Sequence, residues 1–184
     1  CIIMKFMSEL LKLQNGSDVR GIAVEGVVDE HVNLTCEACN KIGQGFIKWL
    51  SEKTGKSAND LKIGVGRDSR VSGPALEEAV IKGMVSTGAS VVRCGLATTP
   101  SMFMSIVFEQ TKFDGSIEIT ASHLPFNRNG LKFFDKDGGL EHDDITSILE
   151  KASSVEEKDV DISKCESFDL LSIYAEHLKK AISE

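Results

Sequence analysis

The sequence predicts an α/β fold, a three-layer α/β/α domain with a mixed sheet. Short segments rich in β-branched residues alternate along the chain with longer segments whose apolar residues recur at helical spacing. Glycines end several of these segments, and two of the three prolines stand at expected helix starts. Strands that alternate with helices are typical of a sheet covered by helices, and such domains place their sites in the loops that follow the strands.

The first half of the chain supplies two strands and two helices. Residues 15–21 form a turn signal that leads into alternating residues at 22–24, which we expect to be extended. Apolar residues at helical spacing predict a helix over 35–53, with a threonine cap before it and a glycine after it. A strand is expected at 61–65. The next helix lies within 72–88, where Ser-Gly-Pro opens it and a glycine stops it.

The second half continues the alternation. A strand is expected at 90–92, and Thr-Pro opens a helix over 99–110. Strands follow at 116–119 and 131–134, and a helix is expected over 143–151. The strand at 116–119 leads directly into the segment that carries the chemistry, as described below.

The domain organisation follows from a change in composition near the C-terminus. Residues 1–151 form the α/β domain, and the polar residues 152–167 are interpreted as a linker. Residues 168–184 contain an amphipathic helix, interpreted as the first element of a truncated second domain. Its apolar face consists of Leu170, Leu171, Tyr174, Leu178 and Ile182. Because the chain begins with Cys1 rather than methionine, we expect it to be a fragment or a processed product.

Composition excludes several classes of protein. A hydrophobic content of 41% in 184 residues is enough for one domain with its own core. The net charge of −7 argues against nucleic acid as a partner. No apolar run approaches the ~20 residues that span a membrane, so no membrane role is expected. Five scattered cysteines do not indicate a disulfide framework, and we expect a reducing compartment, the cytoplasm or a plastid.

The most informative segment is residues 120–132, Thr-Ala-Ser-His-Leu-Pro-Phe-Asn-Arg-Asn-Gly-Leu-Lys. A strand ends directly before it, and Ser122 then lies in a tight turn beside His123. A second turn brings Lys132 back toward the serine. A hydroxyl next to cationic and hydrogen-bonding groups suits phosphoryl transfer, which needs mainly positioning and charge stabilisation.

This segment resembles the phosphoserine loop of the phosphohexomutases, the phosphoglucomutase and phosphomannomutase superfamily. The usual form is T-A-S-H-N-P, followed by N-G and then a lysine. The matching positions are Thr120, Ala121, Ser122, His123, Pro125, Asn129, Gly130 and Lys132. Leu124 stands where the family usually has asparagine, a form similar to one in a plant and algal branch.

Three further stretches resemble the same family in the expected order. Residues 16–21 are similar to its N-terminal turn, which brings an arginine, here Arg20, into the site. Residues 66–70, Gly-Arg-Asp-Ser-Arg, are similar to its G-x-D-x-R segment. Residues 95–100 are similar to the helix start G-x-x-x-T-P.

The resemblance implies an isomerase that works as an intramolecular phosphotransferase between hexose 1-phosphate and hexose 6-phosphate. Phosphorylated Ser122 would give its phosphoryl group to the substrate and form a bisphosphate, with hexose 1,6-bisphosphate as activator. Lys132 would be the general acid or base, while Arg20 and His123 would stabilise the transferring group. Mg²⁺ would bind through the phosphate on Ser122, with its other ligands outside this chain.

The same resemblance leaves the sugar and the oligomeric state open. Glucose, mannose and glucosamine phosphates are all candidates, with glucose the first choice. The metal loop, the sugar loop and the C-terminal phosphate loop of the family have no match here, so we expect the 184 residues alone to be inactive.

Each candidate residue also has a simpler interpretation. Ser122 could be an ordinary loop serine, His123 could only order the loop, and Lys132 could be a solvated lysine. Arg20 could pair with Asp18 or Asp68 and brace the fold. The charged residues Arg67, Asp68 and Arg70 are more typical of a structural network than of a reacting centre.

Two other patterns are interpreted as structural. Cys36 and Cys39 form C-x-x-C at a helix start, but no second pair accompanies them to complete a zinc site. Residues 135–139, Asp-Lys-Asp-Gly-Gly, lack the further ligands of a calcium loop and predict a hairpin turn.

A rival function is a non-catalytic sugar-phosphate-binding or interaction module, in which Leu124 would mark lost catalysis. Against this, we expect the Leu124 side chain to be buried, against Phe126 or Phe133. Such burial stabilises by ~1.5–3 kcal/mol, enough to keep the loop in place without the asparagine.

Overall fold

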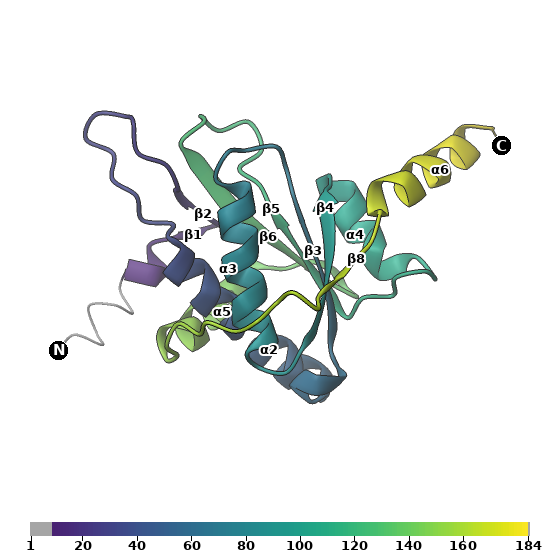
Figure 1. Ribbon diagram of the computed structural model, residues 1–184, viewed down its shortest axis with the longest axis horizontal. Coiled ribbons are helices and arrows are strands. Elements are labelled where there is room, and N and C mark those ends of the chain that lie inside the picture. Colours follow the sequence, from purple (N-terminus) through teal and green to yellow (C-terminus); the bar gives the residue numbers. More distant parts are fainter. Residues whose placement is uncertain (1–8, 184) are drawn as a thin grey trace.

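The structure is a computed structural model that describes residues 9–183, and Figure 1 shows its arrangement. Within these residues, the strands are β1 Gln14–Asn15, β2 Asp18–Ile22, β3 Lys62–Arg67, β4 Ser90–Leu96, β5 Gly115–Ile119, β6 Arg128–Asp135, β7 Gly138–Gly139 and β8 Glu166–Ser167. Residues 9–11 are helical, and the helices that follow are α2 Cys36–Thr54, the short 3₁₀ helix η1 Ala58–Asp60, α3 Gly73–Val85, α4 Thr99–Val107, α5 His142–Ser153 and α6 Leu170–Ser183.

The strands form one mixed sheet, as predicted. Its order is β1-β2-β6-β5-β3-β4-β8, and β7 pairs with β6. The β5-β3-β4-β8 half is parallel. The β1-β2-β6 half is antiparallel and joins the parallel half through an antiparallel β5-β6 pair.

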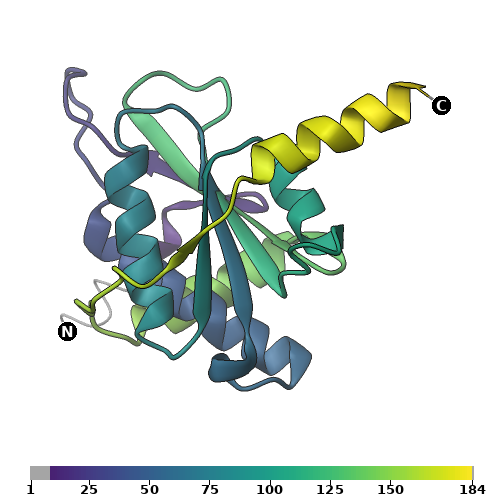
Figure 2. The ribbon, with the colours of Figure 1, turned by 45° about the vertical axis from the view of Figure 1, so that its right-hand side comes forward.

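Helices cover both faces of the sheet and confirm the three-layer architecture. Helices α2, α3 and α5 pack together on one face, over the larger part of the core. Helix α4 lies on the other face, above a smaller cluster that includes Met102, Phe113 and Phe134. Figure 2 shows the sheet edge-on between these two layers.

The predicted start and end of α2, at the threonine and glycine that flank it, are confirmed. Thr35 accepts a hydrogen bond from the Ala38 N–H, which satisfies one of the free amides of the first turn. Gly55 takes a left-handed conformation with φ 72° and ends the helix. Helix α4 ends three residues before the predicted Gln110, because the backbone of Phe108 is extended, with ψ 134°.

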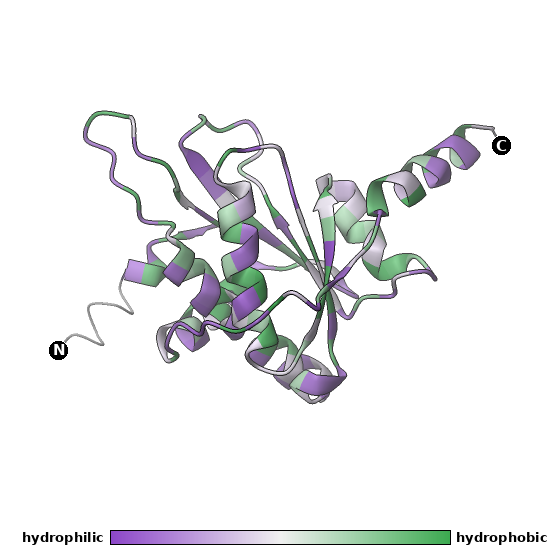
Figure 3. Ribbon diagram, viewed as in Figure 1, coloured by the Kyte–Doolittle hydropathy of each residue, from purple (hydrophilic) through white to green (hydrophobic). Residues whose placement is uncertain are grey.

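The polar segment that follows α5 runs across α2 and joins the sheet. Asn40 donates to the carbonyl of Lys158 and accepts from its amide, and Gln44 donates to the carbonyl of Glu156. Strand β8 then pairs with β4, and Leu170 is buried in the smaller core cluster. The rest of α6 extends away from the sheet, and both polar and apolar residues occur along this helix (Figures 1 and 3).

The parallel half of the sheet decides where the functional loops meet. β3 and β5 are parallel neighbours, and Arg67 is paired with Ile119 at their carboxyl ends. The connection after β3 and the loop after β5 therefore leave the sheet side by side. The amide of Asp68 donates to the carbonyl of Ile119 and fixes the two connections together at their base.

Candidate active site

Ser122 lies in a tight turn directly after β5, in a segment that we name the Ser122 loop, residues 120–127. Its φ of 55° is in the left-handed region, which few residues other than glycine adopt. Its amide donates to Thr120 Oγ1 at 2.9 Å, and the amide of Leu124 closes the turn on the carbonyl of Ala121 at 3.0 Å. The serine side chain is consequently held at the surface, where a substrate can reach it.

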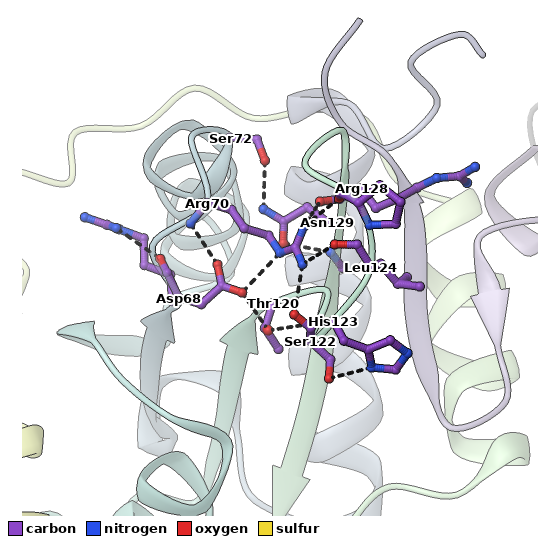
Figure 4. A network of polar contacts seen from close by, with 12 residues as sticks. Asp68, Arg70, Ser72, Thr120, Ser122, His123, Leu124, Arg128 and Asn129 are labelled. Carbon is purple, nitrogen blue, oxygen red and sulfur yellow. Dashed lines mark hydrogen bonds and ion pairs between the residues drawn. The ribbon is translucent and has the colours of Figure 1, made fainter. Parts of the chain in front are cut away.

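His123 lies beside the serine hydroxyl. Its Nδ1 lies 3.4 Å from Ser122 Oγ, and both side chains are exposed (Figure 4). The structure therefore brings together two of the predicted site residues. An imidazole at this distance can exchange a hydrogen bond with the hydroxyl or with a phosphate attached to it.

Arg20 and Lys132 meet at one carboxylate, that of Asp18. Arg20 Nη2 and Lys132 Nζ each lie 2.9 Å from a different oxygen of Asp18. Arg20 also donates to the backbone carbonyl of Thr120, at the base of the Ser122 loop. Of the two carboxylates considered as partners of Arg20, the structure pairs it with Asp18. The described residues contain no hydrogen bond between Lys132 and Ser122.

Glu118 is a buried carboxylate beside this pair that sequence reasoning missed. It lies opposite Lys132 on the paired strands β5 and β6, and it is 2% exposed. Its Oε2 has no hydrogen-bond partner among residues 9–183. Burial is the largest cause that raises its pKa to about 6, although a hydrogen bond from Thr99 opposes the shift. Of the nearby charges, Asp68 raises this pKa, and Arg20 and Lys132 lower it.

Arg70 binds the backbone of the Ser122 loop from the connection after β3. Its Nη2 donates to the carbonyls of Ser122 at 2.9 Å and Leu124 at 2.7 Å. Its Nη1 donates to the carbonyls of Pro125 at 2.7 Å and Arg128 at 3.0 Å (Figure 4). The expected charge network is present, but this arginine serves the candidate site directly.

The C-terminal side of the loop is held by two other segments. Glu30 accepts hydrogen bonds from Asn127 at 2.6 Å and from Arg128 at 2.5 Å. Asn129, which is fully buried, donates to Ser72 Oγ at 2.8 Å, directly before α3. Glu30 was not predicted, and nothing in its local sequence distinguishes it from a solvated glutamate.

The prediction that Leu124 is buried is wrong. Its side chain is 36% exposed, and that of Phe126 is 60% exposed. The physical reason is that the loop is anchored through its backbone, since Arg70 binds the carbonyl of Leu124 and leaves the side chain free. The loop position does not rest on apolar burial at residue 124.

Comparison with known proteins identifies the family of the chain. Residues 11–159 match the family model described as phosphoglucomutase/phosphomannomutase, alpha/beta/alpha domain I. The chain belongs to this family.

Two relatives show how much of a family member is present. A phosphoglucosamine mutase of Lactobacillus acidophilus is 37% identical over 150 residues, which are 80% of this chain and 30% of that protein. A phosphoglucosamine mutase of Leuconostoc citreum is 33% identical over 178 residues, 96% of this chain and 37% of that protein. The chain thus spans about a third of the length of these relatives.

Solved structures of family members share the fold. A phosphoglucomutase/phosphomannomutase family protein from Burkholderia thailandensis has a TM-score of 0.71 at 22% identity, covering 94% of this chain and 35% of that one. The phosphoprotein pp63/parafusin, a phosphoglucomutase from Paramecium in its open form, has a TM-score of 0.68 at 19% identity and covers 90% and 34%.

The two patterns interpreted as structural lie in α2 and in the β6–β7 hairpin. Cys39 is buried in α2, where burial strongly raises the pKa of its thiol, and Cys36 is exposed. Residues 135–139 form the β6–β7 hairpin, and Lys53 binds Asp135 at 2.5 Å and Asp137 at 3.2 Å. Neither segment takes part in the candidate site.

The residues that the structure describes do not make a complete metal site by themselves. Between residues 9 and 183, no group of three or more His, Cys, Asp or Glu side chains is arranged to hold a metal ion. Asp18 and Asp68, two carboxylates beside the base of the Ser122 loop, already accept hydrogen bonds from Arg20, Lys132 and Arg70. Among these same residues, no helix is both long and apolar enough to cross a membrane.

Proposed function

We propose that the full-length protein is a phosphohexomutase that interconverts hexose 1-phosphate and hexose 6-phosphate through a phosphoserine at Ser122. The observation that carries this proposal is the position of Ser122, exposed at the end of β5 in a left-handed turn. The present chain supplies domain I, residues 1–151, and residues 168–184 begin a second domain after a connecting segment. Because the relatives are about three times as long, the 184 residues alone are expected to be inactive.

The surrounding residues support a division of roles. In the forward step, a sugar hydroxyl attacks the phosphorus and gives up its proton. The bond between phosphorus and Ser122 Oγ breaks with its electron pair remaining on Oγ, which takes up a proton from water at this exposed turn and returns to the hydroxyl form. Lys132 is proposed to take the hydroxyl proton and to return it in the reverse step. Arg20 and His123 are proposed to stabilise the charge on the transferring group. Asp18 holds Arg20 and Lys132 close to each other and so keeps both at the site.

Mg²⁺ is proposed to neutralise charge on the phosphoserine when it is bound. The phosphate on Ser122 would be one ligand, and the remaining ligands would come from outside the described residues, since these contain no metal cluster of their own. Hexose 1,6-bisphosphate would phosphorylate Ser122 and act as activator.

The substrate is proposed to be a hexose phosphate of the glucose, mannose or glucosamine series. Both relatives described above are phosphoglucosamine mutases, so glucosamine phosphate is tested first, before glucose phosphate. The cysteines of residues 9–183 are all free thiols, which supports a reducing compartment such as the cytoplasm or a plastid.

Replacing Ser122 by alanine tests the proposal. After incubation of the full-length protein with a hexose 1,6-bisphosphate, mass spectrometry is expected to find the phosphate on Ser122. Ser122→Ala should lose both this phosphate and turnover of hexose phosphates. Ser69→Ala, at an exposed serine in the neighbouring loop, is the matched control and should keep both. A stable phosphate elsewhere, with Ser122 bare, would contradict the assignment.

A further inference from the structure

Arg70 occupies an unusual place for an arginine beside a phosphate-transferring centre. It lies on the connection after β3, next to the loop after β5, because these two strands are parallel neighbours. Its side chain is only 13% exposed. An arginine near such a centre commonly binds phosphate through its planar fork of N–H donors.

Every N–H of this guanidinium already has an acceptor. Nε donates to Asp68 Oδ2 at 3.2 Å, and the two Nη atoms donate to four backbone carbonyls. These carbonyls belong to Ser122, Leu124, Pro125 and Arg128. No donor is left to bind a substrate phosphate, so the arginine serves the loop rather than the ligand.

Arg70 fixes the carbonyl of Ser122 by a direct hydrogen bond and its amide through Asp68 and Thr120. On the carbonyl side, Arg70 binds the oxygen of Ser122 directly. On the amide side, the Ser122 N–H donates to Thr120 Oγ1, which donates to Asp68 Oδ2 at 2.8 Å. Because Asp68 Oδ2 also accepts from Arg70 Nε, the hydrogen bonds form a closed ring around the serine (Figure 4).

The backbone of Ser122 needs such support. A residue with a side chain at φ 55° is strained, and this conformation persists only when its surroundings fix it. The direction of the Cα–Cβ bond, and hence of Oγ, follows from that conformation. Loss of the ring would allow the loop to relax and to turn the hydroxyl away.

We propose that Arg70 is a positioning residue for the phosphoserine, which fixes the left-handed backbone of Ser122 through its carbonyl contacts and Asp68 without contacting the substrate. This inference rests on the proposed function and adds to it the means by which Oγ is aimed. It also accounts for leucine at position 124, since the loop is held by the carbonyl of that residue and not by its side chain.

Arg70→Lys in the full-length protein tests the proposal. Lysine keeps the positive charge but cannot bind four carbonyls in one plane, so it should not replace the arginine. A displacement of the reacting group by about 1 Å costs on the order of 10²-fold in rate, so kcat should fall by about that factor. KM for the hexose phosphate should stay within about two-fold of the wild-type value, because no substrate contact is lost.

Arg67→Lys is the matched control. Arg67 lies in the same segment and pairs with Glu77 on α3 at 3.1 Å, a contact that an ammonium can keep. This variant should retain kcat and KM. An unchanged kcat for Arg70→Lys, with or without a higher KM, would show that the positioning role is wrong.

A spectroscopic measurement separates this inference from the proposed function. In ¹H–¹⁵N spectra of the 184-residue chain, Arg70→Lys should shift or broaden the amide signals of residues 121–124, 126 and 127 and leave those of α2 and α5 unchanged. Unchanged signals for the loop would overturn the inference even if the enzyme is a mutase. Shifted signals in a protein whose wild type has no mutase activity would uphold the positioning of Ser122 and reject the proposed function.

Discussion

Replacing Glu118 by glutamine tests the electrostatics of the candidate site through protein stability. Glu118 is 2% exposed, and one of its carboxylate oxygens lacks a partner among residues 9–183. Burial raises its pKa from 4.5 to about 6 in the folded chain. The ionised carboxylate is therefore destabilising in the fold, since the group gives up its proton more easily when the chain is unfolded.

The magnitude follows from the two pKa values of Glu118. The difference between 4.5 and about 6 corresponds to ~2 kcal/mol of unfolding free energy at 25 °C. This cost is fully present above the folded pKa, and it disappears as the pH falls below the unfolded pKa. Glutamine has nearly the same shape and does not titrate, so it lacks this pH-dependent cost.

The measurement is urea unfolding of the wild type and Glu118→Gln between pH 4.5 and pH 8. The free energy of unfolding of the variant relative to the wild type should rise with pH by roughly 1.5–2 kcal/mol over this range. The other titrating groups occur in both proteins and cancel in the difference. Glu150→Gln, at an exposed position of α5, is the matched control for replacing a carboxylate by an amide. A flat difference for Glu118→Gln, or one that falls with pH, would refute the reasoning.

Two further substitutions test the chemistry and the loop. Lys132→Ala should lower turnover of the full-length protein by ~10²–10⁴-fold if Lys132 is the acid–base group, and single-turnover kinetics with melting curves will separate this loss from a loss of fold. A rate within a few-fold of the wild type would leave Lys132 as the strand residue that pairs with Asp18. Leu124→Asn should change the free energy of unfolding by less than ~0.5 kcal/mol, because the side chain is 36% exposed. Thermal melting checks this, and a large gain in turnover for this variant would favour the binding-module interpretation.

Most of the fold could be predicted because its signals are local. Thr35 and Gly55 stand at the two ends of α2 because a hydroxyl caps the first turn and glycine readily takes a left-handed conformation. Strand β5 is buried over its whole length and is bounded by turn residues, which made it recognisable. The early end of α4 was missed because Phe108 is a residue type that a helix tolerates, and only the extended backbone there ends it.

The candidate site was predictable in its residues but not in its contacts. Ser122 and His123 adjoin in sequence, so their proximity follows from chain connectivity. Glu118 carried a usable signal, namely a carboxylate between Ile117 and Ile119 in a buried strand. The role of Arg70 could not be predicted from its place in the Gly-Arg-Asp-Ser-Arg segment. Four of its five acceptors lie more than fifty residues away in the chain and are backbone atoms, which every residue has.

Backbone contacts of this kind explain why the burial of Leu124 was predicted wrongly. A sequence distinguishes residues only by their side chains. Leucine in place of asparagine therefore suggested that a polar contact is lost and that burial of the leucine side chain replaces it. In the structure, the carbonyl of residue 124 is the atom that is bound, and any side chain leaves it in place. The residue type at position 124 can therefore vary, provided that the guanidinium of Arg70 binds the loop carbonyls. The constraint on the Ser122 loop therefore lies on a different segment of the chain, at Arg70 and Asp68, where the closed ring of hydrogen bonds leaves little freedom for substitution.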